Sequence, residues 1–238
     1  MKIFNLDSPL MQMLSKVADL LLLNLLALFC CIPIVTVGAS LTALNYMALK
    51  IVRNEECYIV RGFFKSFKQN FKQGTLIWLL LLLMIVVLAG DFYIMNNSGI
   101  EFNKVLQVII TIFAMLMLFT AMYVCPVLAK FDNTIWRTIR NAFFMSIMQF
   151  PKTLLMIVLY ILPPLIFVFF YQIAPLAIFF GLSVPAWLSA KLYNKLFQKL
   201  EDQVLAEAEP ELTEEDSEDE RIFKDELDEA LLADENIK

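Results

Sequence analysis

Few side chains in this 238-residue chain could take part in chemistry, and the most notable ones lie inside long apolar runs. Asp19 and Asn24 fall in the first run, and Asp91 falls near the end of the second. A charged or amide group at membrane depth is costly, so it usually pairs with another group or marks a functional site. Lys16 precedes Asp19 by three positions, which predicts a local ion pair. Asn24 is predicted to hydrogen-bond to a neighbouring helix.

Catalytic residue types are otherwise scarce. The chain has no histidine, which removes the commonest general base and metal ligand. Its four cysteines lack zinc-ligand spacing and are predicted to be free thiols in packing positions. No nucleotide-binding, hydrolase, zinc-protease or kinase motif is present. We expect a protein that is not an enzyme and binds no cofactor or metal. One remaining alternative is an enzyme acting on lipid or envelope substrates through Asp19 or Asp91.

A proline and a glycine, Pro33 and Gly38, interrupt the first apolar run. Unwound backbone at membrane depth lines the binding site in several transporter folds. The break therefore allows two interpretations, a substrate site or an ordinary kink.

Phenylalanines and lysines alternate in the segment after this run. The residues concerned are Phe64, Phe67, Phe71, Lys65, Lys68 and Lys72. The phenylalanines recur three and four positions apart, and the lysines occupy other positions around the same helix. This pattern predicts a basic amphipathic helix. It would either lie in the membrane interface against anionic lipid or dock onto a partner.

The composition places these residues in a membrane protein. Hydrophobic residues make up 60% of the chain, charged residues 18%, and the mean hydropathy is +0.69. Soluble domains are closer to 45–50% apolar and about 25% charged. A span needs about 20 apolar residues. Five spans are predicted, the first long enough for two pieces: residues 17–49, 75–95, 105–129, 153–171 and 173–190.

The basic residues are distributed unevenly between the two sides of these spans. Thirteen lie in the segments 50–72, 130–152 and 191–199, whereas three lie at the N-terminal end and between the second and third spans. Basic loops face the cytoplasm. We therefore expect a multi-pass protein of the bacterial cell membrane with its N-terminus outside and its C-terminus in the cytoplasm.

The predicted fold is an all-α polytopic membrane helical bundle over residues 1–200. The segments 61–75 and 140–153 share Arg, Phe-Phe, Ser, Gln, Phe, Lys and Thr in the same order. This similarity predicts a parallel internal repeat with one cytoplasmic amphipathic helix in each unit. Residues 201–238 are predicted to be an acidic cytoplasmic tail, partly disordered and with a short amphipathic helix.

Three segments carry a resemblance to a known family. They read CIPIVTVGAS (31–40), TALNYMALK (42–50) and FFKSFKQNFKQGTLIW (63–78), and Cys125-Pro126 before a basic helix adds to them. Over about residues 1–200 the chain resembles the YesL family of Gram-positive bacterial integral membrane proteins. Members of that family often accompany carbohydrate ABC-transporter components and two-component regulators, so the resemblance implies an association with carbohydrate uptake. The acidic tail has no counterpart in it.

Besides the enzyme alternative, two functions remain open from the sequence. The leading expectation is a non-enzymatic accessory membrane protein of a carbohydrate uptake system. Its partners would be the lipid bilayer together with ABC-transporter subunits or a sensor kinase, and no nucleic acid is expected. The alternative is a small transporter or permease-like subunit whose substrate contacts the broken first span. Substrate and oligomeric state are beyond what the sequence indicates.

Overall fold

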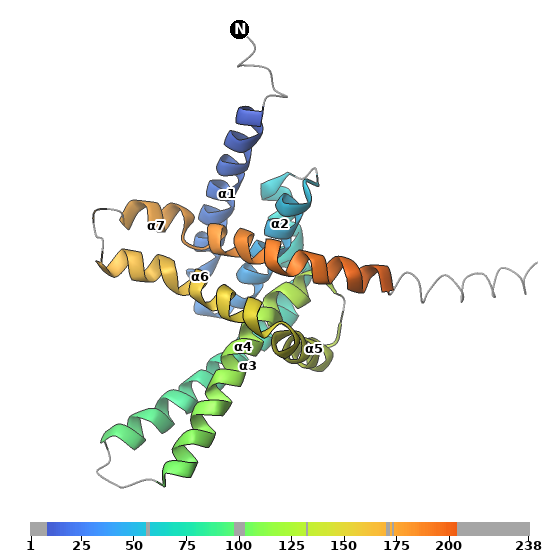
Figure 1. The fold of residues 1–238 in the computed structure, drawn as a ribbon. Helices are drawn as coiled ribbons and strands as arrows, with labels where there is room; N and C mark the ends of the chain where they lie inside the picture. Colours follow the sequence, from blue (N-terminus) through green and yellow to red (C-terminus); the bar gives the residue numbers. More distant parts are fainter. Residues whose placement is uncertain are drawn as a thin grey trace, which may run out of the picture. The chain divides into compact units, whose positions relative to one another are not determined.

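The residues that the structure, a computed structural model, describes are almost all helical and include no strand (Figure 1). These are residues 9–55, 58–97, 103–131, 133–169, 172 and 174–203. The elements are α1 (Pro9–Cys31), η1 (Ile34–Thr36), α2 (Val37–Arg53), α3 (Ile59–Asn97), α4 (Lys104–Lys130), α5 (Ile135–Met148), α6 (Phe150–Phe169) and α7 (Ala174–Phe180). The chain divides into two compact units, Met1–Leu192 and Tyr193–Lys238. Residues 183–192 are helical in the first unit and 193–203 in the second. The predicted tail lies outside the described residues from 204 onward.

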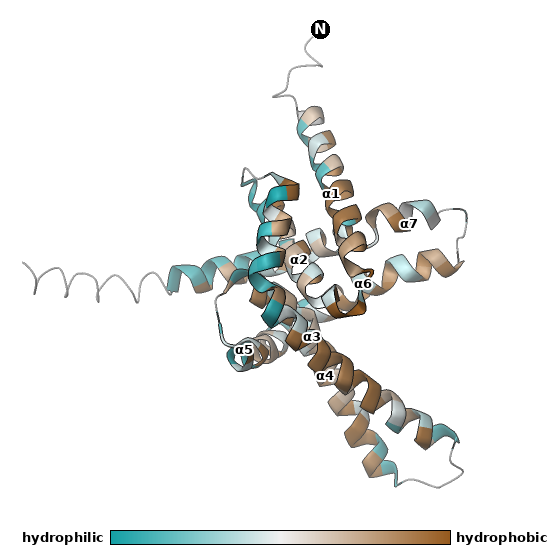
Figure 2. Cartoon of the chain, turned by 180° about the vertical axis from the view of Figure 1, so that it is seen from behind, coloured by the Kyte–Doolittle hydropathy of each residue, from teal (hydrophilic) through white to brown (hydrophobic). Residues whose placement is uncertain are grey.

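Five helical stretches are long and apolar enough to cross a membrane. They are Met11–Cys31, Ile34–Arg53, Ile59–Asn97, Lys104–Lys130 and Phe150–Phe169. The parts of α3 and α4 that extend away from the other helices are mostly hydrophobic, with hydrophilic residues toward their far ends (Figure 2). Leu83, Val108 and Val158 each leave more than half of their surface exposed. Exposed apolar surface on this scale needs a lipid environment. The chain is accordingly a multi-pass membrane protein, and the predicted all-α helical class is confirmed.

The predicted first span, residues 17–49, is long enough for two pieces, and in the structure it forms two helices, α1 and α2. Pro33 has no N–H and restricts the residue before it, so α1 ends at Cys31. The Thr36 hydroxyl donates to the Cys30 carbonyl oxygen at 2.6 Å and satisfies one carbonyl left open at the helix end. The short helix η1 then completes a reversal of direction.

Contacts along the two helices establish that α1 and α2 are antiparallel. Near the turn, the Ser40 hydroxyl donates to the Ala27 carbonyl oxygen at 3.0 Å. At the open end, Lys16 Nζ donates to Asn54 Oδ1 at 2.7 Å. The start of α1 and the end of α2 therefore lie at the same end of the hairpin. The prediction of an outside N-terminus assumed one crossing between them, and the hairpin removes that premise.

Two glycines allow α2 and α3 to cross closely. A Cβ added to Gly38 would clash with the Gly74 carbonyl oxygen, and one added to Gly74 would lie 3.1 Å from the Ala39 Cα. Further along, a Cβ on Gly62 would come within 2.7 Å of the Met47 sulfur. Small residues at a helix crossing let two backbones approach in this way. Most of α2 is buried as a result.

The predicted first amphipathic helix is not a separate element. α3 continues unbroken through residues 60–72 into the predicted span 75–95, and no proline interrupts it. The second amphipathic helix is separate, because α5 ends at Met148 and α6 begins at Phe150, next to Pro151. Pro151 lies in the first turn of α6, where its missing N–H is tolerated, and its ring disfavours the continuation of α5 through this position.

The two units of the predicted repeat have similar burial patterns. Ser66 and Ser146 are both buried, whereas Phe64 and Phe144 are both exposed. The units differ mainly in the break between α5 and α6. The parallel repeat stays a prediction, and these corresponding residues of the two units are alike in being buried or exposed.

The last part of the first unit is a helical hairpin made of α6, α7 and the helix that follows. α6 passes through Pro163 and Pro164 without ending. The predicted fifth span, residues 173–190, is interrupted, because α7 ends at Phe180, residues 181–182 form a turn and helix resumes at 183.

Candidate functional site

The predicted phenylalanine face on α3 is exposed. Val60 and Phe64 each leave 45% of their surface exposed and Phe71 leaves 38%. Phe67 is half-buried, and its ring lies 5.5 Å from the Phe71 ring and 6.2 Å from the Phe63 ring. Phe63, one position away on the helix, is buried. Val60, Phe64, Phe67 and Phe71 therefore form a continuous surface, here called the phenylalanine ridge.

Beside the ridge lies a row of cations, here called the basic stripe: Arg61, Lys65, Lys68 and Lys72. Because a helix turns by about 100° per residue, these four positions cluster about 100° from the centre of the ridge. All four side chains are exposed. Within the described part of the chain, no carboxylate lies within ion-pair distance of them. The sequence predicted this neighbouring arrangement, and the structure places both surfaces on a rigid helix.

The ridge extends away from the membrane-crossing half of α3. A helix rises about 1.5 Å per residue, so the 39 residues of α3 extend for about 58 Å. The hydrocarbon layer is about 30 Å thick, and the headgroups add roughly 5–8 Å on each side. With the span starting near residue 75, Phe71 lies about 6 Å before it and Phe64 about 16 Å before it. In an upright α3, the far end of the ridge therefore stands beyond the headgroups.

Asn24 makes the predicted contact with another helix, and the sequence did not indicate that this contact is at the end of α7. Its side chain is fully buried. Nδ2 donates to the Ile178 carbonyl oxygen at 2.7 Å, and Oδ1 accepts from the backbone N–H groups of Leu182 and Ser183, both at 2.9 Å. These are the groups that lose their partners where α7 ends and the next helix begins. Asn24 thus closes the break in the predicted fifth span.

The break is packed against α3 at Gly38, whereas Pro33 is exposed. Trp78 Nε1 donates to the Ile34 carbonyl oxygen at 2.8 Å, and Gly74 packs against Gly38. The space lined by Gly38, Gly74 and Trp78 measures about 10 Å³. A single water molecule needs about that much room. Gly38 therefore lies at a tight helix crossing, Pro33 lies at the exposed turn before it, and a substrate site at the break stays a prediction.

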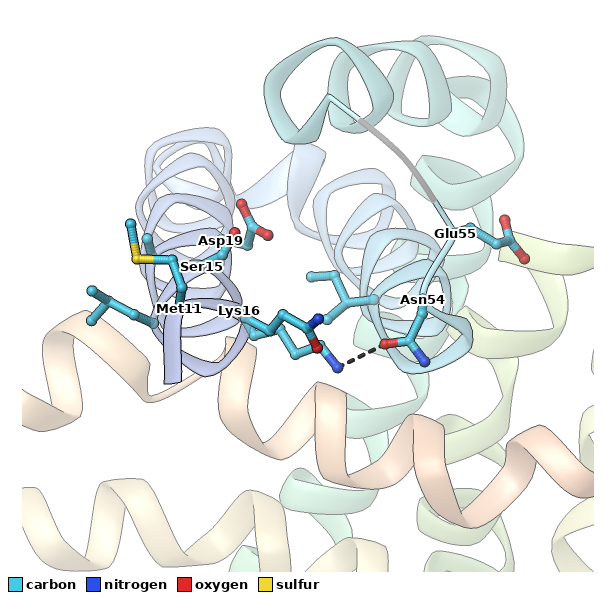
Figure 3. A pocket seen from close by; sticks show the side chains of 10 residues that line it. Met11, Ser15, Lys16, Asp19, Asn54 and Glu55 are labelled. Atoms are coloured by element: carbon cyan, nitrogen blue, oxygen red, sulfur yellow. Dashed lines mark hydrogen bonds between the residues drawn. The ribbon is translucent and has the colours of Figure 1, made fainter. Parts of the chain in front are cut away.

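Asp19 lines an open groove of about 840 Å³ between the start of α1 and the end of α2 (Figure 3). Lys16 extends across this groove to Asn54 instead of pairing with Asp19. The predicted Lys16–Asp19 ion pair is therefore wrong. The backbone of Asn54 adopts the left-handed conformation that ends α2, with φ 53° and ψ 34°. The groove brings one lysine, two carboxylates (Asp19 and Glu55) and amides together at the open end of the hairpin.

Sequence reasoning missed three residues that shape the α1–α2 hairpin and its contact with α3: Asn54, Gly74 and Trp78. Gly74 could have been found, because an isolated glycine inside a helical pattern often marks a close approach of two backbones. Asn54 follows the basic end of α2, where asparagine is a common helix terminator. No sequence pattern indicates the partner of the Trp78 indole.

Comparison with known proteins gives one similarity. A family model described as "Protein of unknown function, DUF624" matches residues 20–92, which is less than one third of the chain. The match covers most of α1, all of α2 and most of α3. It is compatible with the YesL-type resemblance. Neither a curated protein nor a solved structure matches the chain.

Proposed function

We propose that this protein is a non-enzymatic accessory protein of the bacterial cell membrane that docks a partner on the phenylalanine ridge and the basic stripe. The partner would be a membrane-associated protein with an acidic, apolar-faced helix. The single observation that supports this function best is the continuity of α3. An isolated amphipathic helix can lie flat in the interface, but the ridge belongs to the same straight helix as a membrane span.

The charge of the basic stripe and the apolar surface of the phenylalanine ridge both suit such a partner. An exposed phenylalanine beyond the headgroups, as Phe64 would be in an upright α3, favours burial against protein, and aromatic residues dominate the energy of protein interfaces. The basic stripe would steer an acidic partner and set its orientation. Membership of a carbohydrate uptake system is proposed from the YesL resemblance alone. The partner would then be a transporter ATPase, a permease or a sensor kinase.

The proposed orientation differs from the one expected from the sequence. Lys16 contacts Asn54, which lies between the basic residues Arg53 and Arg61. Basic loops face the cytoplasm, so the start of α1 would lie on the cytoplasmic side as well. The C-terminus stays cytoplasmic in this proposal, as Lys191, Lys195 and Lys199 indicate.

A transporter with its site at the broken first span is the less favoured function, because the space beside Gly38 measures only about 10 Å³.

Affinity purification from native membranes in mild detergent tests the docking proposal. We expect a membrane partner to copurify with the full chain. Replacing Phe64, Phe67 and Phe71 by alanine should remove it. The matched control replaces three exposed phenylalanines away from the ridge, Phe92, Phe113 and Phe167, by alanine and should retain the partner.

Two further variants define the contact. Replacing Lys65, Lys68 and Lys72 by glutamine should weaken the association and reduce its salt dependence. Truncation after Lys199 tests whether the acidic tail shares the contact. If the partner stays with the ridge variant, or if none copurifies with the full chain, docking on this ridge is excluded and the interfacial-lipid interpretation is favoured.

A further inference from the structure

A second pocket lies between α2, α3 and α4, away from the ridge and the groove. It has a volume of about 350 Å³. Its polar lining comes from three helices and consists of Tyr46, Ser66, Gln69, Asn70, Gln73 and Lys130. Ligand pockets usually measure about 300–1,000 Å³, so this one has room for a small polar group.

The lining is rich in hydrogen-bond donors and carries a positive charge. Lys130 supplies an ammonium group, and Gln69, Gln73 and Tyr46 supply amide and phenol donors. Asn70 Nδ2 donates to the Ser66 carbonyl oxygen at 3.1 Å and approaches the Ser66 Oγ at 3.4 Å. The Ser66 hydroxyl can therefore keep its own proton for a ligand.

The surroundings add further positive charge. On α3, the basic stripe adjoins the row formed by Gln69 and Gln73, one helical position away in each case. Lys50 Nζ lies 5.3 Å from the centre of the Tyr46 ring, and it also pairs with Glu55 at 3.6 Å. Among the described residues that line the pocket, none is acidic. An anion is therefore the kind of ligand that these side chains favour.

The position of the two glutamines along α3 indicates which kind of anion the pocket would bind. Gln73 lies about 3 Å and Gln69 about 9 Å before the predicted start of the span near residue 75. Gln73 thus lies at the depth of the lipid headgroups and Gln69 at their outer edge. We propose that the pocket between α2, α3 and α4 binds a phosphate group, either that of a phospholipid headgroup or that of a soluble phosphate ester.

Titration of the full chain tests this site. The protein is purified in a neutral detergent, stripped of lipid, and its thermal unfolding is followed while a probe is added. The probes are a short-chain phosphatidylglycerol, glycerol phosphate, and glycerol as the phosphate-free control. We expect both phosphate probes, or the lipid alone, to raise the melting temperature in a saturable way, and glycerol to have no such effect.

Variants show whether the stabilisation comes from this pocket. Lys130→Gln should weaken the apparent affinity about 10- to 100-fold, because a charge-assisted hydrogen bond is lost. Gln73→Ala should weaken it several-fold, and it tests the pocket independently if Lys130→Gln fails to fold. Lys104→Gln makes the same change at the other end of α4 and should leave the affinity unchanged.

The probes also distinguish the two sources of phosphate. Saturation by glycerol phosphate and by the lipid would indicate that the phosphate ester itself is recognised. Saturation by the lipid alone would indicate a headgroup site that also needs the acyl chains. The proposal is overturned if neither phosphate probe stabilises the protein, or if Lys104→Gln weakens binding as much as Lys130→Gln and Gln73→Ala do.

Discussion

At the residue scale, Asn24 illustrates how an amide can satisfy a helix break inside a membrane protein. The end of α7 leaves a carbonyl without a partner, and the following helix leaves N–H groups without partners. Only a side chain with both a donor and an acceptor can bond to both kinds of group. Asn24 does this from α1, more than 150 residues away in sequence. The amide therefore connects the first helix of the chain to the last part of its first unit.

Replacing Asn24 tests this role. Asn24→Ala leaves the Ile178 carbonyl and two backbone N–H groups buried without partners. We expect a loss of about 1–3 kcal/mol in stability, seen as a lower melting temperature in detergent. Asn97→Ala, at the exposed end of α3, is the matched control and should change little. Equal melting temperatures for the two variants would show that the break does not depend on Asn24.

At the element scale, the crossing of α2 and α3 depends on two glycines. Gly38 and Gly74 bring the two backbones into contact, and Trp78 covers the turn before α2 through its bond to Ile34. The same proximity makes α3 a rigid support for the phenylalanine ridge. Gly38, which the sequence suggested for a substrate site, thus also fixes how α2 packs against the helix that carries the ridge.

Two glycine-to-alanine substitutions distinguish the effect of close helix packing on stability from the effect of helix propensity. Gly38→Ala introduces a Cβ that clashes with the Gly74 backbone, so it should lower stability by about 1–3 kcal/mol. Gly90→Ala meets no atom within 4 Å and should raise stability by up to about 1 kcal/mol, since alanine is the better helix former. Thermal unfolding in one detergent compares them. A Gly38→Ala protein as stable as Gly90→Ala would contradict the close crossing.

At the scale of the whole molecule, the α1–α2 hairpin leads to a different membrane topology from the one expected from the sequence. An antiparallel pair returns the chain to the side from which it started, so both ends of the pair lie on the same side. The basic residues around Asn54 then predict that this side is the cytoplasm.

Reporter fusions test this topology. We expect green fluorescent protein at the N-terminus to fluoresce and alkaline phosphatase at the N-terminus to be inactive, because both would lie in the cytoplasm. A phosphatase fused after Asn97, at the far end of α3, should be active and serves as the control. Active phosphatase at the N-terminus would instead support the orientation first expected from the sequence.

The sequence by itself determined the class of protein and its local patterns. Apolar run length predicted membrane helices, and the three- and four-residue spacing of Phe64, Phe67 and Phe71 predicted an exposed apolar face. Both are local periodic signals, which a helix converts directly into a surface. Asn24 was recognised as a residue that needs a partner, since a buried amide is costly without one.

Only the tertiary structure decided how these parts are joined. Pro33 predicts a break, but a break can be a kink or a reversal of direction, and packing against α3 selects the reversal. The partners of Asn24 and the pocket around Lys130 combine segments far apart in the chain. Contacts at such separation leave no local pattern in the sequence, because they depend on which helix faces meet after the turns have formed.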